Sequence, residues 1–166
     1  MTAKYTVIDS QVLATSAASV TFSSIPGGYK DLVLVVDAKP DVTGAKSLSY
    51  RINGDTGGNY PYVVMYGNGS AASSSVSAGA SSVTFAIGGA TESVGNTLGI
   101  SEIMDYSATN KHKSILNRGN DTTGTYTSVD ASAYRWANTS AVTSLEISLS
   151  SGNLDAGSTF RLLGVN

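Results

Sequence analysis

The segment "SLEISLS", residues 144–150, alternates apolar and polar side chains, and this alternation constrains the fold more than any other feature. Leu145, Ile147 and Leu149 fall on one face of an extended segment, and the polar residues between them fall on the other. "SLSYRI" repeats the pattern, with Leu48, Tyr50 and Ile52 on one face. No long stretch keeps the helical period of 3.6 residues. The chain is therefore predicted to be all-β.

Short periodic segments, separated by Gly, Pro, Asn and Asp, recur along the chain and predict many strands. Their even spacing favours an antiparallel β-sandwich or barrel. The predicted strands are Tyr5–Leu13, Ser19–Phe22, Asp31–Ala38, Leu48–Ile52, Tyr62–Tyr66, Ser82–Ile87, Thr97–Tyr106, Ser114–Arg118, Thr125–Val129, Ser144–Leu149 and Thr159–Leu163. The expected core residues are Leu32, Leu34, Val36, Leu145, Ile147, Leu149 and Phe160.

A single domain is the expected organisation, because 166 residues suffice for one sizeable core. A short arm of about residues 1–7 precedes it. The Ser/Ala/Gly tract from Gly67 to Ser82 and the segment from Ile25 to Lys30 are expected to be loops.

The surface is expected to carry few ions. Only 13% of the residues are charged, the net charge is -2, and Ser, Thr, Gly and Ala make up about half of the chain. Such a composition suits a protein that packs against others or works outside a cell. The absence of cysteine excludes disulfides and thiolate metal sites.

The stretch "NGDTGGN", residues 53–59, raises the question of a metal or phosphate loop. A calcium loop would need more carboxylates and a closing Glu, whereas this stretch offers one Asp and two Asn residues. A phosphate cradle would need a following helix, but "YPYVVMY" favours a strand. Asn-Gly instead favours a hairpin turn, and Asp55 and Asn59 can close Asx-turns.

The chain shows no catalytic signature, so no catalytic residue, metal or cofactor is predicted. The single histidine, His112, lies between two lysines in a segment expected to be a solvated loop. Glu102 and Asp105 could serve as paired carboxylates for glycoside hydrolysis, but sequence spacing alone does not place two carboxylates about 5–10 Å apart, and carboxylates in loops or on opposite faces are far commoner. Nucleic acid is disfavoured by a pI of about 5.2.

Neither a membrane nor export by a cleaved signal is expected. The first twelve residues lack the apolar core of a signal peptide, and no run approaches the roughly 18 apolar residues of a membrane span. We therefore expect synthesis in a cytoplasm.

Aromatic residues near predicted turns are the remaining candidates for binding. Tyr60, Tyr62, Tyr134 and Trp136 could stack on a glycan or anchor a protein interface. The alternative is that such residues cover strand ends and form cross-strand pairs.

Four segments, in this order, resemble a family of tailed-bacteriophage virion proteins. They are "TFSSIPGGYKDLVLVVDAK", "YRINGDTGGNYPYVVMYGNGS", "ISEIMDYSATNKHKSILNRG" and "YRWANTSAVTSLEISLSSGNLDAGSTFRLLGVN". The resemblance extends along nearly the whole chain, but Leu163 replaces a tyrosine and Ile52 replaces an aromatic residue of the family pattern.

The resemblance implies a sandwich of jelly-roll type on a phage capsid or tail appendage. We expect a non-enzymatic decoration protein that binds the outside of the head as a homotrimer and reinforces contacts between major capsid subunits. Met1, Thr2, Ala3, Lys4 and Tyr5 are the expected capsid or subunit contacts. The alternative is a receptor- or glycan-binding module of a tail fibre or tailspike, with a host-surface glycan as its partner.

Overall fold

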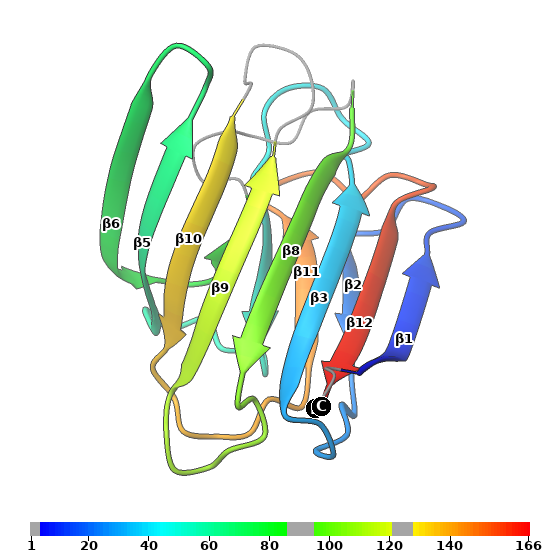
Figure 1. The fold of residues 1–166 in the computed structure, drawn as a ribbon. Coiled ribbons are helices and arrows are strands. Elements are labelled where there is room, and N and C mark those ends of the chain that lie inside the picture. Colours follow the sequence, from blue (N-terminus) through cyan, green and yellow to red (C-terminus); the bar gives the residue numbers. More distant parts are fainter. Residues whose placement is uncertain (1–3, 86–94, 121–127) are drawn as a thin grey trace.

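The strands of this protein form two stacked antiparallel layers, as a computed structural model shows (Figure 1). The structure describes residues 4–85, 95–120 and 128–166. The larger sheet has eight strands in the order β1-β12-β3-β8-β9-β10-β5-β6, and the smaller has four in the order β2-β11-β4-β7. The predicted all-β sandwich is thus confirmed, and no helix is present among the described residues.

Twelve strands make up these sheets within the described ranges. They are β1 (Tyr5–Val12), β2 (Ser19–Phe22), β3 (Asp31–Ala38), β4 (Leu48–Ile52), β5 (Tyr60–Gly67), β6 (Ala72–Ala80), β7 (Val83–Thr84), β8 (Thr97–Met104), β9 (Lys113–Asn120), β10 (Val129–Trp136), β11 (Leu145–Leu149) and β12 (Thr159–Val165).

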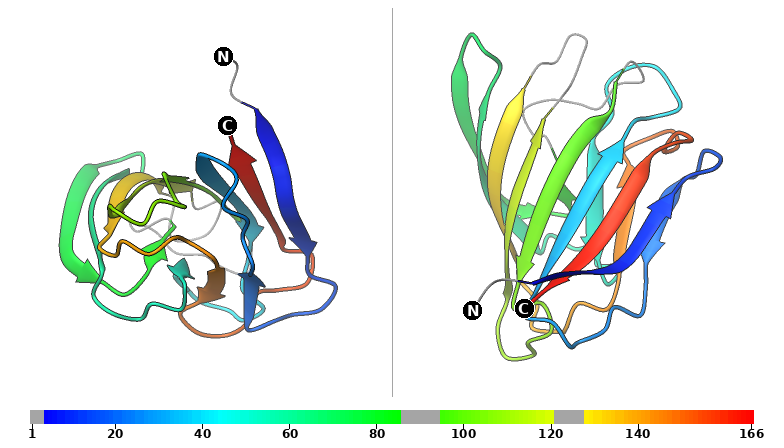
Figure 2. Two further views of the ribbon diagram at one scale, coloured as in Figure 1. Left: turned by 90° about the horizontal axis from the view of Figure 1, so that it is seen from below. Right: turned by 45° about the vertical axis from the view of Figure 1, so that its right-hand side comes forward.

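Chain connections repeatedly cross between the two layers. The sheet changes at every step along the chain except within two hairpin pairs and at the step from β8 to β9. These pairs, β5–β6 and β9–β10, lie side by side at one end of the larger sheet. They extend it as the series β9-β10-β5-β6, so that β1 and β6 form its two edges (Figure 2).

The core lies between the layers, and six of its seven predicted members are buried. Leu32, Leu34 and Val36 of β3 face Leu145 and Ile147 of β11, and Phe160 adds a ring from β12. The alternation with a period of two residues therefore predicted the burial of these six side chains correctly. Leu149 is half-buried, because it lies at the last position of β11.

Two predicted segments are corrected by the structure. The tract Gly67–Ser82 is not a loop, because Ala72–Ala80 form β6 and pair with β5. "NGDTGGN" is a turn but not a hairpin, because β4 belongs to the smaller sheet and β5 to the larger. The stretch is a corner that carries the chain from one layer to the other.

The other predicted strands agree with the structure to within a few residues where it describes them, apart from segments near β1 and β10. Of the predicted strand Ser82–Ile87, Val83–Thr84 form β7, and the last two residues lie outside the described residues. The expected arm of about residues 1–7 overlaps β1, since Tyr5–Val7 pair with β12. The expected strand Thr125–Val129 meets the described residues only at its end, where β10 begins and continues to Trp136.

Candidate interaction surfaces

Most of the aromatic residues proposed for glycan binding lie in the core. Tyr60, Tyr134 and Trp136 are almost fully buried. Tyr62 is half-buried, and its ring packs at a tilt on Tyr134 with 5.0 Å between the centroids. The alternative reading, in which these residues form cross-strand pairs and cover strand ends, fits these positions.

Hydrogen bonds explain why three of these rings are held inside. Trp136 donates from its indole N–H to Asp55 Oδ2 at 2.8 Å. The Tyr60 hydroxyl accepts from the Ile52 amide at 3.0 Å and donates to the Asp55 carbonyl at 3.2 Å. Burial raises the pKa of Tyr60 to about 12. The Tyr134 hydroxyl accepts from the Thr84 amide at 3.1 Å.

Asp55 organises the corner between β4 and β5. Its Oδ1 accepts from the Gly57 amide at 2.9 Å, which closes the predicted Asx-turn, and Asn59 donates to the same carboxylate. Burial acts to raise the pKa of Asp55, but the hydrogen bonds from Trp136, Gly57 and Asn59 outweigh it and hold that pKa below its ordinary value. The carboxylate is thus used structurally rather than offered to a ligand.

Asn53 fastens the same corner to the loop that precedes β11. It has a positive φ of 53°, as does Gly54 at 68°, and the pair forms the turn that Asn-Gly predicted. Its side chain donates to the Ala141 carbonyl at 2.8 Å and accepts from the Thr143 amide at 2.8 Å. Residues 53–59, which raised the question of a metal loop, therefore have a structural role, because Asn53 bonds this corner to the loop before β11.

Lys113 is a buried cation with a structural role. It is fully buried at the start of β9, and its ammonium donates to the carbonyls of Ala108, Lys111 and Thr139. The ammonium lies 5.9 Å from the Trp136 ring centroid. Burial lowers the pKa of Lys113, and the neighbouring charge of Lys111 adds to this effect. The Lys113 side chain thus joins the loop between β8 and β9 to the loop between β10 and β11.

The other charged candidates are dispersed. Asp105 pairs with Lys111 at 3.0 Å, whereas Glu102 occupies a half-buried position on β8. His112 is exposed in the loop before β9. Among the described residues no group of three or more His, Cys, Asp or Glu side chains could hold a metal ion. Within those same ranges, no helix is long and apolar enough to cross a membrane.

The first exposed apolar surface lies on β1. Tyr5, Val7 and Val12 leave 61%, 57% and 67% of their surface exposed. The strand is hydrogen-bonded on one side to β12 and has an irregular register between Val7 and Asp9. Of the predicted contact residues, Tyr5 lies on this edge and Lys4 bonds to Asn166, while Met1, Thr2 and Ala3 lie outside the described residues.

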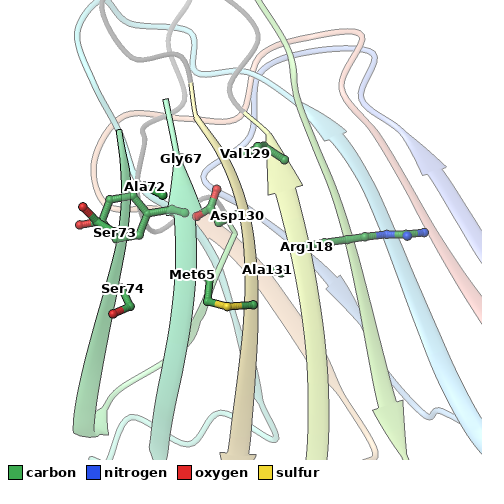
Figure 3. A pocket seen from close by; sticks show the side chains of 10 residues that line it. Met65, Gly67, Ala72, Ser73, Ser74, Arg118, Val129, Asp130 and Ala131 are labelled. Carbon is green, nitrogen blue, oxygen red and sulfur yellow. The ribbon is translucent and has the colours of Figure 1, made fainter. Parts of the chain in front are cut away.

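The second exposed apolar surface lies on the opposite end of the larger sheet, on the face turned away from the smaller sheet. We call it the outer patch. It consists of Val63, Met65, Val76, Leu98, Leu116 and Val129. Figure 3 shows part of it, where the Met65 side chain of β5 extends toward Ala131 of β10 and Arg118 extends from β9 across β8. Sequence reasoning missed this surface, because its strands β6 and β10 were not recognised.

No model of a known protein family matches the chain, and no curated protein is significantly similar to it.

Proposed function

We propose that this protein is a non-enzymatic structural component of a tailed-phage virion, which decorates the outside of the capsid as a homotrimer. In this role it reinforces contacts between major capsid subunits, after synthesis in the host cytoplasm. The proposal rests on the sequence resemblance and on one structural observation.

That observation is the pair of exposed apolar surfaces at opposite ends of the larger sheet. Large exposed apolar groups on a folded domain mark sites of association. β1 offers an edge with Tyr5 and Val12, and the outer patch offers Met65 and Leu116. A decoration protein needs two such surfaces, one for the capsid and one for its neighbours. We assign β1 and the residues before it to the capsid.

The strand order supports a jelly-roll assignment for the sandwich. Without the two hairpin pairs, the layers reduce to β1-β12-β3-β8 and β2-β11-β4-β7. Eight strands in two four-stranded layers, with every connection except that from β4 to β7 crossing between the layers, are the arrangement expected of a jelly roll. The hairpin pairs are then additions that lengthen one sheet.

The alternative role, a glycan-binding module of a tail appendage, loses its original support. Three of the four aromatic residues proposed for sugar stacking are in the core, where hydrogen bonds hold them. Stacking on a sugar requires an accessible ring face.

Copy number per virion tests the proposal. Quantitative mass spectrometry of purified virions compares the amount of this protein with that of the major capsid protein. Decoration predicts hundreds of copies in each particle. A handful of copies would instead support a tail module, and absence from purified virions would contradict a virion role altogether.

A further inference from the structure

Three adjacent strands of the larger sheet have an inverted polarity. β8, β9 and β10 turn mainly small or polar side chains toward the interior, among them Thr97, Ser101, Asn117, Asp130 and Ser132. Most of the alternate positions, which face outward, carry apolar side chains, and the remaining ones carry polar or charged side chains. The apolar ones are Leu98, Ile100, Met104, Leu116, Val129, Ala131 and Ala133, and the others are Glu102, Ser114, Arg118, Asn120 and Arg135. A sheet with one solvated face normally shows the reverse. The outside of these strands is therefore built as a contact face.

The shape of this face fits a protein partner. Ala131 and Ala133 of β10 form the floor of a shallow groove, with Leu116 of β9 on one side and Met65 of β5 on the other. Val76 of β6 pairs with Val63 and continues the apolar surface to the sheet edge. Val76 is 75% exposed, Met65 67% and Leu116 58%.

The area of the outer patch approaches what an interface requires. Its six side chains offer on the order of 600 Å² of apolar surface, the upper end for the largest patch on a monomer. The alanine floor and the rim add to this area. A standard interface buries about 800 Å² on each partner. One continuous contact could therefore cover most of the patch.

The charges beside the patch are self-complementary. Glu102 pairs in register with Leu116, and Arg118 pairs with Ile100, so the two charges lie on a diagonal of neighbouring strands. Ion pairs among the described residues join Lys39 to Asp155 and Lys111 to Asp105, and involve neither Glu102 nor Arg118. With Arg135 of β10, which is exposed on the same face, the surface carries charges of both signs, and around a three-fold axis Arg118 of one copy can lie beside Glu102 of the next.

We propose that the outer patch is the surface through which copies of this chain contact one another. Met65, Leu116 and Val129 supply the buried apolar centre, while Glu102 and Arg118 set the register between copies. The inference rests on the proposed function only in expecting three copies around a common axis. β1 then remains free for the capsid.

Charge placed at the centre of the patch tests this assignment. The full chain carrying Met65→Glu and Leu116→Glu should self-associate at least about 100-fold more weakly than wild type, because both carboxylates would be buried without partners. Sedimentation velocity and light scattering over a range of concentrations measure the effect. Val42→Glu, at an exposed apolar position outside both surfaces, is the matched control and should assemble like wild type.

Retention of the melting temperature and near-ultraviolet circular dichroism would show that the double variant is folded, as expected for side chains exposed in the monomer. Two results would overturn the proposal. The first is a wild-type protein that stays monomeric at a concentration 100-fold above the one at which it binds virions, and the second is a double variant that assembles normally. A dimer that the same variants dissociate supports the surface and contradicts only the trimer.

Charge reversal tests the register. Glu102→Arg and Arg118→Glu should each weaken assembly about tenfold or more, because each brings like charges together. The double reversal should restore most of the lost affinity. If the double reversal is as weak as the two single changes combined, then Glu102 and Arg118 do not pair between copies, and this part of the proposal fails.

Discussion

At the scale of single residues, Asp55 is the acceptor that ties Trp136, Gly57 and Asn59 into the corner between the layers. Asp55→Ala leaves the Trp136 indole N–H without its partner, and should lower the free energy of unfolding at pH 7 by about 2 kcal/mol. Urea denaturation measures the change. A variant as stable as wild type would show that the corner does not depend on this carboxylate.

The same residue gives a pH dependence with a defined sign. The pKa of Asp55 is lower in the folded state than its ordinary value of 3.8. Its ionised form therefore contributes stability above about pH 4, and this contribution disappears as the pH falls through the folded-state pKa. The stability difference between wild type and Asp55→Ala should shrink as the pH is lowered from 5 toward 2.5. An undiminished difference at low pH would contradict this account of the carboxylate.

Lys113 provides a second prediction at this scale. Lys113→Met keeps the length of the side chain but removes donors to three backbone carbonyls. We expect a loss of about 2 kcal/mol in the free energy of unfolding. Lys111→Met, at an exposed position two residues away, should cost much less. Equal effects of the two substitutions would argue against a structural role for the hydrogen bonds of the Lys113 ammonium.

Local chemistry explains which residue roles could be predicted. The turn at Asn53 and the Asx-turn at Asp55 follow from properties of those residues and their immediate neighbours. The burial of Trp136 does not, because it depends on Asp55, which lies 81 positions away in the chain. The buried position of Lys113 likewise comes from loops that meet only in the folded protein.

At the scale of strands, β11 is the centre of the smaller sheet, between β2 and β4. Ile147 lies in the middle of this strand and is fully buried. Ile147→Ala should therefore lower the free energy of unfolding by about 2–5 kcal/mol. Val42→Ala, at an exposed position, is the control and should change it by less than about 0.5 kcal/mol. Similar stabilities of the two variants would mean that Ile147 is not in the core.

Strand prediction succeeded where large apolar side chains alternate with polar ones, as in β4 and β11, or form a continuous apolar run, as in β3. It failed for β6, whose sequence "ASSSVSAGA" is built from residues with weak strand preference and is held by pairing with β5. It failed also for most of β10, where Asp130 and Ser132 face inward while Val129 faces out. Both failures lie in the part of the sheet that forms the outer patch.

At the scale of the whole molecule, composition and periodicity predicted one domain that is an antiparallel β-sandwich or barrel, and the structure is a two-layer sandwich. They could not predict the order of strands, because neighbours such as β1 and β12 come from opposite ends of the chain. Nor could they predict the outer patch, which arises only when β8, β9, β10, β5 and β6 lie side by side.

The N-terminal edge gives a prediction at this scale. Removing Met1–Tyr5 eliminates the bonds between Lys4 and Asn166 and one pair of the β1–β12 ladder. The fold should persist with a loss of about 1 kcal/mol. Binding to capsids that lack the protein should weaken, and co-sedimentation measures it. Unchanged capsid binding would remove the N-terminal segment from the proposed contact.

A cryo-electron microscopy reconstruction of the intact virion tests the central claim most directly. The account predicts density for this sandwich on the outer surface of the capsid, in three-fold groups, with β1 toward the capsid and the outer patches of neighbouring copies in contact. Density only at the tail tip, or a capsid surface without this sandwich, would contradict it.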